Sequence, residues 1–176
     1  AIIIPSRLDA MRLPSKPLKL INNKEMILHV YEAALKANAG EVYVATPDEV
    51  IVDLIKKFGG NSVLTSKNHA TGTDRVFQVF KETLNNEPNI IVNLQGDMPY
   101  YKKELLTDTL SLLEDDQVDI GTAACVLDPA DCQNPNVVKV QVNLKNKQGF
   151  AQDFNRNVKS VNQCYRHIGV YAFRPK

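Results

Sequence analysis

The sequence opens with AIIIPSRLDAMRLPSKPL (residues 1–18), which combines an apolar run with a strongly basic segment. The run Ile2-Ile3-Ile4 is too short for a helix and is rich in β-branched side chains, so it predicts a buried β-strand. Pro5 ends that strand. The first feature of the fold is therefore a buried strand whose carboxyl end leads directly into a loop.

That loop carries four cationic side chains and a single acid, Asp9. Open α/β sheets bind phosphorylated ligands at the carboxyl ends of their strands. Four cations in one loop repel each other unless solvent or an anion lies between them. A triphosphate would be such an anion. The alternative is a solvated, charged surface loop. No Gly-rich P-loop motif occurs, so side chains and a few backbone amides would hold the phosphates. The cations are Arg7, Arg12, Lys16 and Lys19.

The bulk properties exclude several classes of protein. A chain of 176 residues with 44% apolar and 23% charged residues suits one soluble globular domain. Its net charge of +1 argues against nucleic-acid binding, and its apolar runs are too short to span a membrane. The start of the chain lacks a signal-peptide pattern, and its three cysteines indicate neither a disulfide framework nor a zinc site. We therefore expect a protein of the reducing cytoplasm.

Strands alternate with helices through about residue 120. Helical spacing predicts a helix over residues 24–38, ended by Gly40, and a second one that starts at Thr46-Pro47-Asp48-Glu49 and runs to Gly59-Gly60. A third helix follows the capping box Thr71-Gly72-Thr73-Asp74, and a fourth carries leucines between residues 105 and 113. Between and before these helices, strands are predicted over residues 41–45, 62–65 and 90–94.

The alternation of strands and helices ends at about residue 120. Beyond it, strands are predicted over 120–127, 137–144 and 168–173 with little helix between them. The first part predicts βαβ units and a mostly parallel sheet covered by helices on both faces. The second part predicts antiparallel strands appended to it. We expect a single α/β domain with residues 1–118 forming the nucleotide-binding βα part and 119–176 an antiparallel part.

Asp97 follows the predicted strand 90–94 directly, next to a glycine that allows the backbone to turn. A carboxylate at the carboxyl end of a strand, facing the basic loop, is a natural ligand for Mg²⁺ on a nucleotide. The alternative is that Asp97 caps the helix that follows.

The segment HATGTDR (residues 69–75) is a loop that runs into a helix start. The backbone amides of Gly72 and Thr73 are placed to bind a carbonyl or phosphate oxygen, and Arg75 to reach a base or a phosphate. The alternative is a capped helix with a surface arginine.

Two arginines, a histidine and a tyrosine form a last cluster around the final predicted strands. This cluster suits a carboxylated, hydroxyl-rich ligand, because arginine binds a carboxylate with two parallel hydrogen bonds. The alternative for His167 is an ordinary residue at the edge of a strand. Three scattered histidines argue against a zinc site, and the sequence shows no Ser-His-Asp or Cys-His pattern at recognisable spacing. The cluster consists of Arg156, Arg166, His167 and Tyr171.

Five segments in register together resemble one family, the 3-deoxy-manno-octulosonate (Kdo) cytidylyltransferases or CMP-Kdo synthetases. Each segment is weak alone, but they occur in the family's order and cover nearly the whole chain. They are RLPSKPL at 12–18 with the strand before it, HATGTDR at 69–75, VNLQGDMP at 92–99, NPNVVKV at 134–140 and YRHIGVYAFR at 165–174.

The resemblance implies a nucleotide-diphosphosugar-transferase-like fold of Rossmann-like type and the reaction CTP + Kdo → CMP-Kdo + pyrophosphate, a step of lipopolysaccharide biosynthesis. It also implies Mg²⁺ as the cofactor and a homodimer. Asp97 would hold the metal and, with Arg7 and Lys16, carry the catalysis. The nucleotide would contact Ser6, Arg7, Arg12, Lys16, Thr71, Gly72 and Arg75, and the sugar acid Gln95, Arg156, His167 and Tyr171.

The sequence departs from the family at three places. Met98 stands where the family has Glu, and the segment between Arg156 and Arg166 is short, with Phe154-Asn155-Arg156 in place of Phe-Ser-Arg. The family's closing segment, with a second metal-binding aspartate and a dimer-forming region, has no counterpart before Lys176. We therefore expect either a longer natural chain or a protein that lacks the full two-metal site. The alternatives are a nucleotidyltransferase for another sugar or sugar acid, and a non-catalytic nucleotide-binding relative.

Overall fold

The computed structural model describes residues 1–9, 13–158 and 161–175, and the chain forms two compact units within it. The first unit contains residues 1–121 together with the segment from Val170 onward, and the second contains residues 122–169. Among the described residues, every helix is too short or too polar to cross a membrane.

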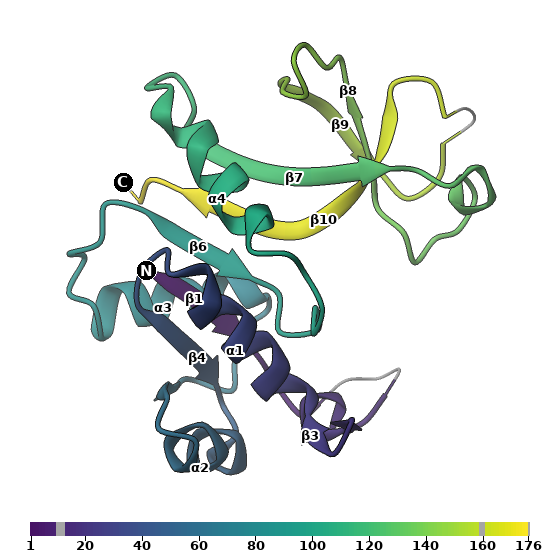
Figure 1. The fold of residues 1–176 in the computed structure, drawn as a ribbon. Helices are drawn as coiled ribbons and strands as arrows, with labels where there is room; N and C mark the ends of the chain where they lie inside the picture. Colours follow the sequence, from purple (N-terminus) through teal and green to yellow (C-terminus); the bar gives the residue numbers. More distant parts are fainter. Residues whose placement is uncertain (10–12, 159–160, 176) are drawn as a thin grey trace. The chain divides into compact units, whose positions relative to one another are not determined.

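The first unit is built on a sheet in which four strands run parallel (Figure 1). Their spatial order is β5 (Asn61–Leu64), β4 (Val42–Thr46), β1 (Ile2–Pro5) and β6 (Ile91–Leu94). The end of β10 (Cys164–Phe173) joins beside β6 in the antiparallel direction, with Val170 opposite Leu94. The predicted mostly parallel sheet with antiparallel strands is confirmed.

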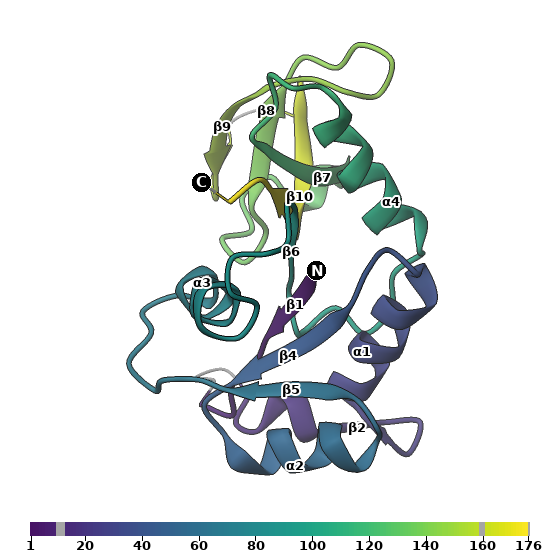
Figure 2. The ribbon, with the colours of Figure 1, turned by 90° about the vertical axis from the view of Figure 1, so that its left-hand side faces the viewer.

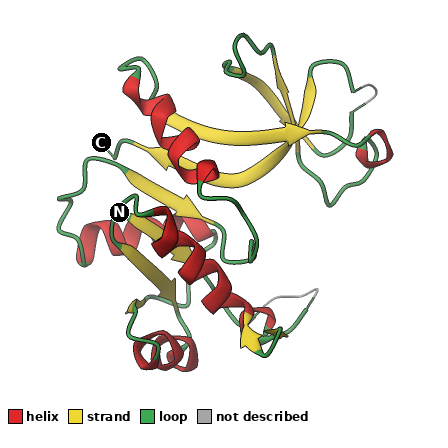
Figure 3. Ribbon diagram, viewed as in Figure 1, coloured by secondary structure: helices red, strands yellow, loops and turns green. Residues whose placement is uncertain are grey.

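Helices cover this sheet, as Figure 3 shows in red. They are α1 (Met26–Ala37), α2 (Glu49–Lys57), α3 (Gly72–Glu82) and α4 (Glu104–Ser111). The described residues also form three short 3₁₀ helices (Lys16–Leu18, Leu112–Glu114 and Pro129–Asp131) and a small hairpin of β2 (Leu20–Ile21) and β3 (Lys24–Glu25).

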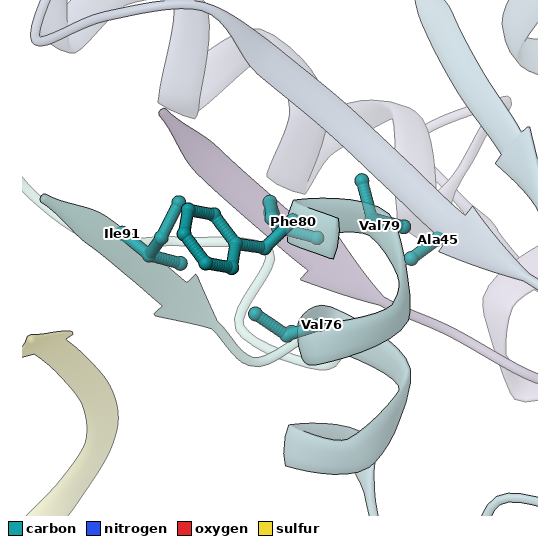
Figure 4. Close-up of a cluster of buried hydrophobic side chains, with 6 residues drawn as sticks. Ala45, Val76, Val79, Phe80 and Ile91 are labelled. Carbon is teal, nitrogen blue, oxygen red and sulfur yellow. The ribbon is translucent and has the colours of Figure 1, made fainter. Parts of the chain in front are cut away.

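The predicted first strand, β1, is the centre of the core, because it is flanked by strands on both edges and covered on both faces. Its side chains alternate between the faces. Ile3 packs with α3 side chains in a cluster of buried residues (Figure 4), and Figure 2 shows α3 and α1 on opposite sides of these strands. All three isoleucines are fully buried, and each such burial stabilises the fold by roughly 1.5–3 kcal/mol.

The second unit is antiparallel. In it, β8 (Lys139–Val142) lies between β9 (Ala151–Asn155) and the first part of β10, with Tyr165 opposite Val140. The strand β7 (Ile120–Val126) also pairs with β10. The sequence pattern missed β9, whose residues are all exposed and lack the apolar alternation of a half-buried strand.

Several predicted boundaries are wrong, each for a local reason. Helix α1 starts at Met26 rather than at residue 24, since the two preceding residues pair in the β2–β3 hairpin, and it ends in the left-handed residue Asn38, before Gly40. Helix α2 starts at Glu49 behind Asp48, so the predicted cap Thr46 is wrong. Thr46 is instead the last residue of β4 and is fully buried.

Candidate active site

A cavity of about 300 Å³ opens at the carboxyl ends of β1 and β6 in the first unit. Three segments that are far apart in the sequence line it: the basic loop, the start of α3 and the residues that follow β6. Sequence reasoning placed the basic loop opposite Asp97 because the carboxyl ends of parallel strands share one edge of the sheet, and the family resemblance added the start of α3. The lining residues are Pro5, Ser6, Arg7, Lys16, Pro17, Met26, Thr71, Gly72, Arg75, Gln95, Gly96 and Asp97.

Lys16 and Asp97 form an ion pair across this cavity. Lys16 begins a 3₁₀ helix that follows Ser15 in the left-handed conformation, and its Nζ lies 2.8 Å from Oδ2 of Asp97. The lysine side chain is 35% exposed and the aspartate 55%. Because both groups are open to solvent, a charged ligand can compete with this contact, and the pair adds less than about 1 kcal/mol to the stability of the fold.

The helix-cap alternative for Asp97 is wrong. Helix α4 begins at Glu104, and Lys103 occupies the cap position, so six residues separate Asp97 from the first residue of the helix. The carboxylate is a feature of the cavity rather than of a helix end.

Gly96 allows β6 to pass close to the end of β1. A Cβ atom at this position would lie 2.8 Å from the backbone oxygen of Pro5, closer than side-chain carbons approach such atoms. Only glycine lets Gln95 and Asp97 flank the turn without displacing β1.

We expect Gly96→Ala to lower the free energy of unfolding by about 1–3 kcal/mol, the usual cost of overpacking a rigid contact. The measurement is urea denaturation. Gly59→Ala is the matched control. Gly59 has a φ of +82° and open space around it, so that variant should lose stability through backbone strain alone. A Gly96→Ala protein as stable as the unchanged chain would contradict the steric argument.

The start of α3 has the capping box that the sequence predicted. Thr71 Oγ1 accepts from the Asp74 backbone amide at 3.1 Å, and the Thr71 amide donates to the Asp74 carboxylate at 2.9 Å. The hydrogen bonds from Thr71 lower the pKa of Asp74. Gly72 lies against Pro5, where a Cβ would come within 3.2 Å of the proline ring. The first turn of α3 is therefore ordered beside the end of β1.

Arg75 is buried, so the surface-arginine alternative is wrong. Its side chain is 3% exposed, and Nη1 donates to Thr65 Oγ1 and to the Ser66 carbonyl, the latter at 3.0 Å. Burial, and then the positive charge of Arg7, lower the pKa of Arg75. Arg7 is exposed, and both arginines line the cavity. Two neighbouring cations at one cavity favour an anionic ligand.

Ser6 presents a buried hydroxyl to the same cavity. It is 8% exposed, and among the described residues its Oγ has no hydrogen-bond partner. A buried polar group without a partner costs free energy, and a bound ligand or water would remove that cost. Arg12, also predicted at this site, lies outside the described residues.

The residues predicted to bind the sugar acid do not all line this cavity. Gln95 does, beside the residues assigned to the nucleotide. Tyr171 lies in the first unit opposite Asn93 of β6, and burial raises its pKa, but it is not among the cavity-lining residues. Arg156 and His167 belong to the second unit.

Within the second unit, both of these side chains are held by neighbours. Arg156 is exposed and donates from Nη1 to the Pro135 carbonyl at 2.7 Å. His167 Nε2 lies 2.9 Å from Thr122 Oγ1, and the ring meets Phe154 edge-on at 5.2 Å. Burial lowers the pKa of His167, which favours the neutral form of the ring. Arg166 points to the opposite face of the strand and lies 3.8 Å from Asp131.

Asp97 is the carboxylate that the sequence predicts as a metal ligand. Among the described residues, no three His, Cys, Asp or Glu side chains are grouped to hold a metal ion. Mg²⁺ is commonly held by one or two carboxylates together with substrate phosphates and water. A single partly exposed carboxylate at the edge of a cationic cavity fits an ion that arrives with a nucleotide.

Comparison with known proteins identifies the family of the chain. The family model for cytidylyltransferases matches residues 1–176. The 3-deoxy-manno-octulosonate cytidylyltransferase of Thermodesulfovibrio yellowstonii is 36% identical over 97% of this chain and 73% of its own. A second such enzyme, from Actinobacillus pleuropneumoniae, is 38% identical over 98% of this chain and 74% of its own.

A solved structure gives the same result. The structure of CMP:2-keto-3-deoxy-manno-octonic acid synthetase complexed with CTP superposes with a TM-score of 0.86 at 35% identity, over 98% of this chain and 73% of that one. The predicted nucleotidyltransferase fold is confirmed. The family model over the whole chain, the two relatives and this structure lead to one conclusion: the chain belongs to the cytidylyltransferase family, with the CMP-Kdo synthetases as its relatives.

Proposed function

We propose that this protein transfers the cytidylyl group of CTP to Kdo and releases pyrophosphate. The observation that carries the proposal is the cationic cavity at the ends of β1 and β6, with Arg7 and Lys16 opposite the carboxylate of Asp97. It occurs in a chain similar throughout its length to a synthetase whose structure was solved with CTP.

The chemistry needs no covalent intermediate on the protein. The anomeric hydroxyl of Kdo attacks the α-phosphorus, the bond from that phosphorus to the β-phosphate oxygen breaks, and the hydroxyl proton leaves to solvent. Negative charge grows on the departing pyrophosphate, where Arg7 and Lys16 stabilise it. Thr71, Gly72 and Arg75 seat the nucleotide. Catalysis is then mostly positioning and charge neutralisation.

Asp97 would hold Mg²⁺ in this scheme. When bound there, the ion would supply positive charge that neutralises the phosphates. Lys16 contacts the same carboxylate, so the lysine and the metal would both bind Asp97. Gln95, Arg156, His167 and Tyr171 are the proposed contacts to the sugar acid, with Arg156 supplying the charge for its carboxylate.

The direct test is pyrophosphate release from CTP, Kdo and Mg²⁺, with thermal shifts measured in CTP, UTP, GTP and ATP. A large shift in CTP alone and Kdo-dependent pyrophosphate release support the proposal. A larger shift in another nucleotide, or release only with another sugar, would favour a different nucleotidyltransferase. Met98, in the place of the family's Glu, favours a second candidate, a nucleotide-binding protein without turnover. Binding of CTP with no pyrophosphate released would support that one.

His167→Ala should raise KM for Kdo about tenfold and leave CTP affinity nearly unchanged. The physical reason is the loss of one polar contact to the sugar acid, while the cavity for the nucleotide lies in the other unit. Steady-state kinetics with varied Kdo, together with calorimetry for CTP, measure the two effects separately.

Arg166→Ala is the matched control, because Arg166 is the next residue but points to the other face of β10. It should leave both constants unchanged. A fall in CTP affinity of the His167 variant, with Kdo dependence unaltered, would show that His167 has been assigned to the wrong substrate.

Two further properties belong to the same proposal. A homodimer is expected from the resemblance, and Val126 (83% exposed) and Phe150 (72% exposed) are candidate contact residues in the second unit. Light scattering on the purified protein tests it. A cytoplasmic location agrees with Cys125, Cys132 and Cys164, which are all free thiols.

A further inference from the structure

Asn93 is a fully buried amide in a strand that is otherwise apolar. Strand β6 reads Ile91-Val92-Asn93-Leu94, and Asn93 is 1% exposed. Its backbone lies between Ile3 of β1 and Tyr171 of β10. Strands buried on both faces favour Val, Ile and Leu, and an amide in such a position costs free energy unless it is hydrogen-bonded.

Of the two polar atoms of the Asn93 side chain, one has a hydrogen-bond partner among the described residues and the other has none. Nδ2 donates to Thr73 Oγ1 at 3.3 Å, whereas Oδ1 is buried and has no partner among the described residues. Thr73 is the second residue of α3 and is itself exposed. The hydrogen bond of Asn93 therefore reaches out of the sheet to the first turn of the helix.

These two elements form two walls of the candidate active site. Gln95 and Asp97 follow the end of β6, two and four residues after Asn93, while Thr71 and Gly72 stand at the start of α3. At the far end of β6, Ile91 packs with Phe80 of α3 in the apolar cluster of Figure 4. At the cavity end, the contact between Asn93 and Thr73 is a polar one.

We propose that Asn93 is a positioning residue, which holds the first turn of α3 at a set distance from the residues that follow β6 and thereby determines nucleotide affinity. The identity of the nucleotide, CTP, rests on the proposed function. Asn93 touches no ligand in this scheme, since neither it nor Thr73 lines the cavity. It acts through Thr73 on Thr71 and Gly72.

Two variants test this from opposite ends of the hydrogen bond. Thr73→Val removes the acceptor oxygen at an exposed site, keeps the side-chain shape and leaves the core untouched. Asn93→Leu removes the donor. Each should weaken CTP binding about three- to tenfold by calorimetry, the usual effect of one neutral hydrogen bond. The double variant should bind no more weakly than either single one, because both remove the same contact.

A second readout separates positioning from a purely structural role. Asn93→Leu also removes the unsatisfied Oδ1, so its midpoint of thermal unfolding should stay the same or rise while its CTP affinity falls. Thr107→Val is the matched control, since Thr107 is an exposed threonine on α4 whose Oγ1 donates to the Glu104 carbonyl within its own helix turn. That variant should bind CTP like the unchanged protein.

The outcomes that overturn the inference differ from those that overturn the function. If the unchanged protein binds CTP and Thr73→Val binds it within twofold, Asn93 has no positioning role. The same follows if the two single effects multiply in the double variant. If Asn93→Leu fails to fold, the Thr73→Val result decides alone. An unchanged protein that binds no CTP would overturn both proposals together.

Discussion

Asp97→Asn is expected to slow pyrophosphate release by about a thousandfold or more while the protein stays folded. The substitution keeps the size and hydrogen-bonding shape of the side chain but removes the charge that would anchor Mg²⁺. Losing a preorganised electrostatic contact to the reacting phosphates typically costs ~3–4 kcal/mol of transition-state stabilisation or more. Steady-state turnover with saturating CTP and Kdo is the measurement, repeated with Mn²⁺, which should restore a small part of the activity.

Stability should survive this change, because the carboxylate contributes little to the fold. It is more than half exposed, caps no helix, and its partner Lys16 is partly exposed too. The melting temperature should therefore stay within a few degrees of the unchanged protein. Asp53→Asn, on the exposed side of α2, controls for the loss of one acid elsewhere in the unit. Near-normal, Mg²⁺-dependent turnover in Asp97→Asn would refute the metal assignment and the mechanism built on it.

Lys16→Ala is expected to weaken CTP binding and to slow turnover together. The ammonium group would contact the triphosphate both in the bound nucleotide and as pyrophosphate departs. One charged contact is worth roughly 1.5–3 kcal/mol, which corresponds to about 10- to 150-fold in affinity. Calorimetry with CTP and steady-state kinetics measure the two effects.

Lys19→Ala is the control for this result. Lys19 belongs to the same basic loop, but it does not line the cavity, so its loss should change affinity only slightly through long-range charge. Equal effects of the two substitutions would mean that the loop attracts the nucleotide by its overall charge. Unchanged kinetics in Lys16→Ala would mean that Lys16 belongs to a solvated surface loop and does not bind the nucleotide.

The sequence alone determined the strand at the centre of the fold and the type of its sheet. Ile2-Ile3-Ile4 is a local signal, since three consecutive β-branched residues admit few other buried structures. The capping box at Thr71–Asp74 is equally local, because its hydrogen bonds join residues three apart. The meeting of the basic loop with the residues after β6 also followed from the sequence, because parallel strands bring their carboxyl ends to one edge.

The tertiary structure alone decided what those residues contact. The Lys16–Asp97 pair joins groups 81 positions apart. No local sequence pattern distinguishes this role of Asp97 from that of a helix cap. Arg75 is buried where Thr65 and Ser66, which directly follow β5, accept its hydrogen bonds. In the sequence, Asn93 is a polar residue in an otherwise apolar strand. Its contact with Thr73, which the structure reveals, is the basis of its proposed positioning role. Periodicity and capping are local properties of the chain, whereas burial and hydrogen-bond partners depend on segments that only folding brings together.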